Sequence, residues 1–218
     1  MIKYLIKFVS QLDHAKMLLR GELFMRPASY YHGLEQGQGD AGEALVFHGL
    51  SMYKNGEFPI YCFYSVDDSE IQNNRFKVSE KCITDFKCAD RYAVLIDFPS
   101  FDERIPTLER DGYSLWYDSV SYGVPTPQLS ARIVMKNELT NLFIKHQVFA
   151  YQKEYRISIG KTVYNSETPM DKRADHVIFK FPSGLDDIAQ IVEISRLQKD
   201  YDGYVFDLSD LPVVGNRD

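Results

Sequence analysis

Short segments rich in β-branched, aliphatic and aromatic residues recur along the chain, separated by turn-forming residues. Such segments favour β-strands, because branched and aromatic side chains pack well on a pleated surface. Helical patterns are limited to residues 11–21, 137–146 and 183–194, of which the last two begin with the capping residues Asn137 and Ser183. We expect strands at residues 2–10, 22–27, 44–53, 58–66, 91–98, 112–123, 149–160, 176–181 and 204–208.

The balance of these segments predicts the fold class. Strands outnumber helices, the helices cluster near the two ends, and no linker or repeat divides the 218 residues, so we expect one α+β domain over residues 1–218. Its sheet should be largely antiparallel and aromatic, since the chain holds 15 Tyr and 14 Phe. Segments 44–53 and 58–66 flank the turn sequence KNGE and are expected to pair as a hairpin.

Charge and cysteine content exclude several classes of protein. A formal net charge of −6 argues against nucleic-acid binding through a general basic field. A local basic patch stays open, and the densest basic run holds Arg75, Lys77, Lys81 and Lys87. Three cysteines without a C-x-x-C pair fit neither a disulfide framework nor a zinc site. The N-terminus lacks a signal-peptide pattern and no apolar run approaches the ~20 residues of a membrane span, so we expect a cytoplasmic protein without membrane contact.

A glycine motif, G-x-G-x-x-G, occurs at Gly37, Gly39 and Gly42. In dinucleotide-binding folds this spacing follows an apolar strand and opens a helix, whose N-terminus holds the pyrophosphate. Here a polar segment precedes the glycines, β-forming residues follow them, and Asp40 and Glu43 add negative charge. We therefore interpret the motif as a loop.

The segment AYQKEYRISIG, residues 150–160, carries the most informative polar pattern. If it is a strand, alternation places Tyr155, Ile157 and Ile159 on one face, which has the composition of a core. The opposite face carries a polar row, which is either solvated, the commoner case, or the floor of a cleft. This row consists of Gln152, Glu154, Arg156 and Ser158.

Glu154 within Q-x-E resembles the third motif of ADP-ribosyltransferases, a family with a split-sheet α+β fold and an Arg–Ser–Glu or His–Tyr–Glu constellation. Arg26 ends the segment ELFMRP and Ser65 ends YCFYS, where that family has its first and second motifs. The segments LLRGELFMRPASYY, IYCFYS, RYAVLIDF and YQKEYRI also resemble an uncharacterised bacterial family found in phage-defence and toxin-like loci, over most of residues 8–160.

Two departures from the transferase pattern affect the first two motifs. Arginine-specific members carry Ser-Thr-Ser where this chain has FYSVDD, so only Ser65 carries over. Pro27 shortens the strand of Arg26, which leaves a neighbouring aromatic or imidazole side chain as an alternative first-motif residue. These alternatives are Tyr30, Tyr31 and His32.

The resemblance implies that NAD is a substrate and assigns roles to the matching residues. Glu154 would bind the ribose 2′-hydroxyl and stabilise the oxocarbenium-like sugar, and Gln152 would face the acceptor. Arg26 and Arg156 would bind NAD, the former as a planar donor fork. Rings that could stack on nicotinamide or adenine, although core packing is their commoner role, belong to Tyr30, Tyr31 and Phe63.

We therefore expect an NAD-dependent ADP-ribosyltransferase that acts as an intracellular bacterial toxin or phage-defence effector. Its acceptor is RNA or protein, and an antitoxin or chaperone is a further expected partner; the Q-x-E variant favours an amide or nucleobase over arginine. One alternative is a non-catalytic binding or regulatory domain of the same fold. Another is a metal-dependent nuclease using Asp40, Glu43 and Glu154, although their spacing carries no metal-binding signal.

Overall fold

The computed structural model describes residues 1–33, 45–48, 51–54, 58–88, 91–109, 113–123, 142–160 and 175–211. Its contacts divide the chain into two compact units. The first comprises Met1–Leu23, Phe63–Leu108 and Lys180–Asp218, and the second comprises Phe24–Cys62 and Glu109–Phe179. The α+β prediction is confirmed, since mostly antiparallel strands are combined with a few short helices.

The first unit is built on a sheet with the strand order β5-β1-β7-β13. β1 (Ile2–Val9) pairs antiparallel with the second half of β5 (Pro59–Asp67) and with β7 (Tyr92–Asp97), and β7 pairs antiparallel with β13 (Ala189–Glu193). The four central residues of β7 are at most 3% exposed. This burial explains the continuous apolar run of the segment, because a strand covered on both faces has no solvated row.

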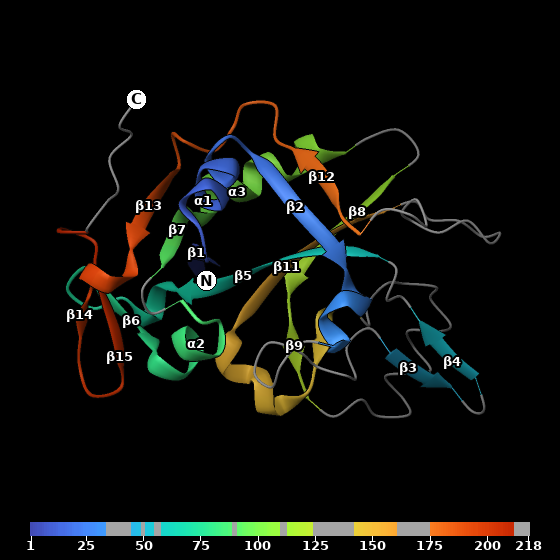
Figure 1. Ribbon diagram of the computed structural model, residues 1–218, viewed down its shortest axis with the longest axis horizontal. Helices are drawn as coiled ribbons and strands as arrows, with labels where there is room; N and C mark the ends of the chain where they lie inside the picture. The colour runs from blue at the N-terminus through green and yellow to red at the C-terminus, as the bar shows by residue number, and fades with distance from the viewer. Residues whose placement is uncertain are drawn as a thin grey trace. The chain divides into compact units, whose positions relative to one another are not determined.

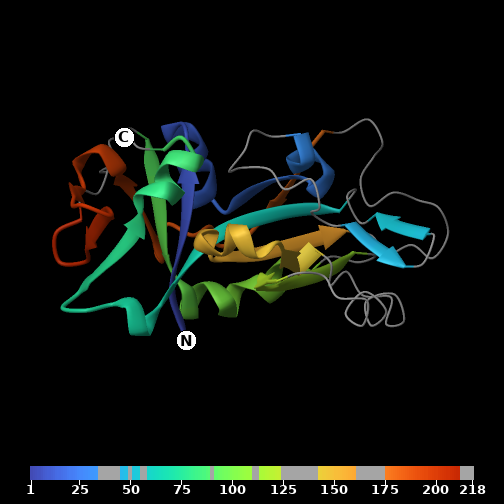
Figure 2. The ribbon, with the colours of Figure 1, turned by 90° about the horizontal axis from the view of Figure 1, so that it is seen from below.

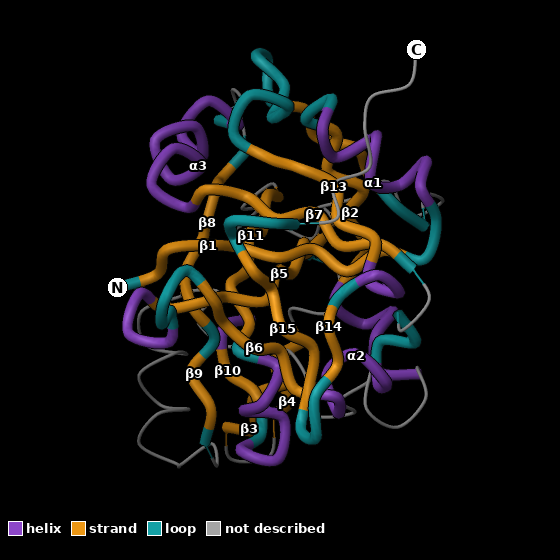
Figure 3. The backbone as a smooth tube through the Cα atoms, turned by 90° about the vertical axis from the view of Figure 1, so that its left-hand side faces the viewer, coloured by secondary structure: helices purple, strands orange, loops and turns teal. Residues whose placement is uncertain are grey.

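Two helices cover this sheet. α1 (Leu12–Leu19) contacts β1, β7 and β13, and α3 (Phe98–Arg104) contacts β1 and β7. Figures 2 and 3 show α1 and α3 on opposite faces of the sheet. Gly21 lies two residues after the end of α1, and its φ of +81° and its close approach to the Phe181 carbonyl both require a residue without a side chain.

A second, smaller sheet of the first unit has the order β14-β15-β6, with antiparallel pairing throughout. Figure 3 shows its three strands side by side. α2 begins directly after β6, where the Ser79 hydroxyl accepts a hydrogen bond from the Cys82 amide and caps the helix. The remaining elements of this unit are β6 (Arg75–Ser79), α2 (Glu80–Asp85), β14 (Gln198–Lys199), β15 (Gly203–Asp207) and the 3₁₀ turns η2 (Asp68–Glu70), η3 (Ile105–Leu108) and η6 (Ile194–Arg196).

The second unit carries strands in the order β12-β2-β5-β11-β8. Figure 1 labels these strands, and Figure 2 shows β11 in gold between β5 and β8. Every residue of β11 is buried. The elements are β2 (Glu22–Pro27), η1 (Ala28–Gly33), β3 (Leu45–His48), β4 (Ser51–Lys54), the first half of β5, β8 (Ser114–Ser119), β9 (Ser121–Tyr122), β10 (Ile144–Lys145), η5 (Gln147–Gln152), β11 (Glu154–Gly160) and β12 (Val177–Lys180).

Several predicted elements differ from the structure. β3 pairs with β4, so segments 44–53 and 58–66 do not form a hairpin with each other. Residues 183–194 form turns followed by β13 and then η6 rather than a helix. In segment 137–146, the described residues 142–146 contain a 3₁₀ turn and β10, also not a helix. Helices α2 and α3 lie in the middle of the chain, where none was expected.

Three further points concern the glycine motif, the cysteines and the length of the helices. Gly37, Gly39 and Gly42 lie outside the described residues. Cys62, Cys82 and Cys88 form no disulfide with one another. Within the ranges that the structure describes, no helix combines the length and hydropathy needed to cross a bilayer.

Candidate functional site

The polar row predicted for segment 150–160 is buried in the second unit. Gln152, Glu154, Arg156 and Ser158 are 1%, 5%, 1% and 0% exposed, so the interpretation as a solvated face is wrong. Gln152 is the last residue of η5, and β11 begins at Glu154. Between them Lys153 adopts a left-handed backbone conformation with φ +42°. The chain thus turns once between the two polar residues of Q-x-E.

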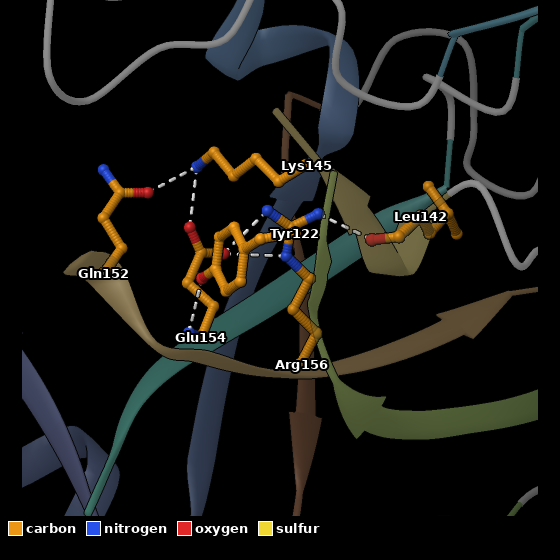
Figure 4. Close-up of polar contacts among 6 residues, drawn as sticks. All are labelled: Tyr122, Leu142, Lys145, Gln152, Glu154 and Arg156. Carbon is orange, nitrogen blue, oxygen red and sulfur yellow. Dashed lines mark hydrogen bonds and ion pairs between the residues drawn. The ribbon is translucent and has the colours of Figure 1, made fainter. Parts of the chain in front are cut away.

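The Glu154 carboxylate is held by two cationic side chains (Figure 4). Lys145 Nζ donates to Oε1 over 2.6 Å, and Arg156 donates to Oε2 from Nε over 2.8 Å and from Nη2 over 2.7 Å. The same Lys145 ammonium donates to Gln152 Oε1 over 2.7 Å. Gln152, Glu154 and Arg156, which the sequence placed on one face, are therefore brought together, and Lys145 joins them.

A short parallel ladder between β9 and β10 positions this cluster. Tyr122 in β9 is paired with Lys145 in β10, and the Gly123 amide donates to the Lys145 carbonyl over 3.0 Å. The Tyr122 hydroxyl accepts a hydrogen bond from the Glu154 backbone amide over 2.7 Å. Two residues that are neighbours across the ladder thus contact Glu154, one at its backbone and the other at its carboxylate.

The electrostatics of the cluster keep Glu154 ionised. Burial alone raises the pKa of a carboxyl group, but the positive charges of Arg156 and Lys145 outweigh that effect and lower the pKa of Glu154 to about 2. Burial and the negative charge of Glu154 raise the pKa of the Tyr122 hydroxyl above its usual range. At neutral pH the cluster therefore contains an ionised carboxylate and a neutral phenol.

Arg26 lies in β2 among aromatic rings. Its guanidinium carbon is 4.1 Å from the centroid of Tyr30 and 5.5 Å from that of Phe24, and its Nη2 is 4.0 Å from an oxygen of Asp175. Tyr30 is 43% exposed, and the His176 ring stacks on the Phe24 ring with 4.3 Å between their centroids. Arg26 and Tyr30 thus form a cation–π pair with an accessible ring.

Leu142 connects an apolar group that includes Ala28 to the cluster around Glu154. The side chain of Leu142 is fully buried with Ala28 and Ile60, and Tyr31 packs against this group. The Leu142 carbonyl accepts a hydrogen bond from Arg156 Nη1 over 2.6 Å (Figure 4). Leu142 therefore belongs to this apolar group through its side chain and binds Arg156 through its backbone.

Two predicted site residues belong to the first unit. Ser65 is paired with Leu5 of β1 and is 8% exposed. Phe63 is 2% exposed, and its ring lies 5.3 Å from that of Phe101 in an edge-on arrangement. Phe63 thus occupies a core position, the commoner role for such a ring. The proposed part of Ser65 in the second motif stays a prediction.

Sequence reasoning missed Lys145 and Tyr122. Lys145 falls in a segment for which we expected a helix, and Tyr122 looked like one more aromatic residue of a strand. The available signal was weak: Lys145 is a single charge at the end of the apolar run LFIK. His32 lies in η1, and Asp40 and Glu43 lie outside the described residues. Among the residues described, no His, Cys, Asp and Glu side chains gather as a metal site.

Comparison with known proteins identifies no relative. The sequence matches no protein-family model, and no curated protein and no solved structure matches it. The function therefore rests on the chemistry of the residues around Glu154.

Proposed function

We propose that the chain is an NAD-dependent ADP-ribosyltransferase whose reaction centre contains Glu154 and Gln152. The convergence of these two side chains carries the proposal. Gln152 Oε1 and Glu154 Oε1 lie 2.7 Å and 2.6 Å from the same Lys145 Nζ, so the amide and the carboxylate are immediate neighbours. A Q-x-E centre needs such an arrangement, because one group acts on the ribose while the other faces the acceptor.

In this reaction the bond between ribose C1 and the nicotinamide nitrogen breaks, and nicotinamide leaves with the bonding electrons. The acceptor nucleophile then bonds to C1 and loses a proton. Positive charge develops on the ribose, and a preorganised carboxylate stabilises it by a few kcal/mol, on the order of what one charged group contributes in an enzyme. The low pKa of Glu154 supports this role, because the group is ionised at any physiological pH.

Arg26 and Tyr30 support the binding of a dinucleotide. A guanidinium presents planar paired donors that match a diphosphate, and an exposed ring beside it can stack on a nicotinamide or adenine base. Arg26 is partly exposed, with 28% of its side chain accessible. We assign Arg26 to the diphosphate and Tyr30 to a base.

The pairing within the cluster sets a condition for catalysis. Glu154 is 5% exposed, and both of its oxygens accept hydrogen bonds from buried cations. The ribose 2′-hydroxyl must therefore replace one of these contacts when NAD binds. Arg156, to which the resemblance gives a role in NAD binding, orients the carboxylate in this state.

The same burial favours a second candidate function. A buried carboxylate that is paired with two cations is also typical of an ion cluster with a purely structural role. A domain with such a cluster can bind a partner without catalysing a reaction. In that case the chain is a non-catalytic binding or regulatory domain. NAD turnover separates the two functions, because only the enzyme releases nicotinamide.

The direct experiment follows NAD labelled in its adenylate half. Purified protein is incubated with labelled NAD and total bacterial lysate, and the products are divided by protease and ribonuclease treatment. We expect label that ribonuclease releases, which would identify RNA as acceptor; label that only protease removes would identify a protein instead. If no nicotinamide is released and no fraction carries label, the transferase function is rejected.

Binding is tested independently of turnover. At 100 times its dissociation constant, NAD stabilises the folded state by about 2.7 kcal/mol, which a thermal-shift titration detects. Arg26→Lys keeps the charge and loses the paired donors, so it should weaken this stabilisation. The control variant Lys199→Arg alters an exposed ion pair with Glu80 in the first unit and should leave it unchanged.

We further propose a cellular role as a toxin in phage defence, which rests on the resemblance to defence-locus proteins. Expression of the chain in bacteria should then arrest growth, and an antitoxin or chaperone would be its partner. A Glu154→Gln variant that is shown to be folded should relieve the arrest. Equal toxicity of the two forms would remove Glu154 from the mechanism.

A further inference from the structure

Lys145 determines which way the Gln152 amide faces. An ammonium group can only donate hydrogen bonds, and of the two ends of an amide only the oxygen can accept one. The contact of 2.7 Å between Lys145 Nζ and Gln152 therefore requires Oε1 at this position. The amide nitrogen, with its two donors, is directed to the other side.

The Lys145 ammonium is itself firmly placed. The residue is 4% exposed, and its backbone is held in the β9–β10 ladder. Its Nζ contacts Gln152 and Glu154 and lies 5.0 Å from the centroid of the Phe149 ring. Because the ammonium group is held in this way, it can fix the positions of the two side chains that it binds.

We propose that Lys145 is a positioning residue that fixes the orientation of the Gln152 amide and thereby directs the acceptor to the reaction centre. The effect on transfer rests on the proposed function, whereas the coupling between Lys145 and Gln152 does not. Without Lys145 the amide oxygen loses the charged donor that fixes it at this position. Glu154 keeps its two contacts with Arg156, so the carboxylate stays paired when Lys145 is replaced.

This assignment predicts a change in the fate of cleaved NAD. The cation formed from NAD reacts either with the acceptor, giving ADP-ribosylated acceptor and a proton, or with water, giving ADP-ribose and a proton. Loss of amide orientation impairs the first path and leaves the second. Lys145→Met should therefore raise the ratio of hydrolysis to transfer, by about tenfold if one oriented hydrogen bond is lost. Lys145→Arg, which still donates, should stay close to the wild-type ratio.

The ratio distinguishes positioning from a merely structural role. A variant that is partly unfolded loses both activities in proportion, so its ratio of hydrolysis to transfer is unchanged. An unchanged ratio in Lys145→Met would therefore overturn the catalytic part of the inference. A raised ratio that Lys145→Arg does not restore would also overturn it.

A stability measurement tests the contact without any activity. Gln152→Glu places a second carboxylate against the Lys145 ammonium, and the same substitution in a Lys145→Met background leaves that carboxylate without it. We expect Gln152→Glu to shift the unfolding equilibrium at least about tenfold more in the Lys145→Met background, since contacting residues couple by this order. Equal shifts in both backgrounds would show that Lys145 does not hold residue 152. If wild-type protein cleaves no NAD, this measurement alone decides whether the positioning contact exists.

Discussion

Glu154→Gln should destabilise the protein strongly, because it removes the negative charge that pairs with two buried cations, Lys145 and Arg156. A glutamine side chain has the same shape but offers one oxygen and one NH₂ group. Whichever way it faces, the NH₂ group meets a donor, either Lys145 Nζ or the Nε and Nη2 of Arg156. Breaking a buried pair in this way costs about 3–5 kcal/mol.

The size of this effect can be set against the stability of an ordinary domain. Folded proteins are stable by about 5–15 kcal/mol, so the variant loses a substantial share. The melting temperature of a chain of this length falls by about 2–4 °C per kcal/mol, which predicts a decrease of roughly 6–20 °C. Each cation left without its partner contributes part of this loss. The double variant Lys145→Met/Glu154→Gln should therefore lose about 1–3 kcal/mol less unfolding free energy than the two single variants lose in sum.

Urea denaturation provides the assay. Trp116 is the chain's only tryptophan and lies in β8 with its ring 6.0 Å from that of Phe58, so its fluorescence reports on the second unit. Glu80→Gln is the matched control, because Glu80 pairs with Lys199 at the surface and exposed pairs contribute about 0–1 kcal/mol. If Glu154→Gln cost no more than Glu80→Gln, the cluster would not be a tightly paired ionic site and the reasoning would fail. The folded fraction of Glu154→Gln must also be measured before any loss of activity is attributed to chemistry.

Three further predictions concern the cluster and the backbone next to it. The stability contributed by Glu154 should be fully present above its ordinary pKa of 4.5 and should be lost as the pH falls towards its folded value of about 2, so acid titration of Glu154→Gln should give a flatter stability curve between these values than wild type. Lys153→Gly should stabilise the protein by about 0.5–1 kcal/mol, because a left-handed conformation costs a residue with a side chain roughly 1–2 kcal/mol and the greater freedom of glycine in the unfolded state offsets part of this gain. Lys153→Ala is the control, and a glycine variant that is less stable than the alanine variant would contradict the prediction. Tyr122→Phe leaves the Glu154 amide without its acceptor and should cost about 1–3 kcal/mol in urea denaturation, whereas Tyr201→Phe, at a fully exposed position, should cost almost nothing.

Local sequence patterns predicted the strands well where a strand is buried and its residues are apolar for that reason. The continuous apolar run of β7 and the alternation of Tyr155, Ile157 and Ile159 both correspond to buried strands. Residues 183–194 show the limit of such patterns. Their spacing suits a helix, but pairing of Ala189–Glu193 with β7 makes this part a strand, and that pairing joins residues almost a hundred positions apart.

The candidate site was predictable only where its residues are close together in the sequence. Gln152, Glu154 and Arg156 stand out because they follow one another at every second position. Lys145 and Tyr122 reach them through the β9–β10 ladder, and nothing in the two-residue strands indicates which segments pair. The polar row was expected to be solvated because isolated Glu and Arg residues seldom lie in a core; their burial depends on a cation whose position the sequence does not reveal.

Leu142 has a consequence for how this protein can change in evolution. Its side chain belongs to the apolar group with Ala28 and Ile60, while its carbonyl binds Arg156. A substitution that alters the volume of this apolar group will therefore shift a backbone oxygen on which a buried guanidinium depends. Among descendants of this chain, changes at positions 28, 60 and 142 should accordingly accumulate together, as compensating sets, while each of them alone should be removed by selection.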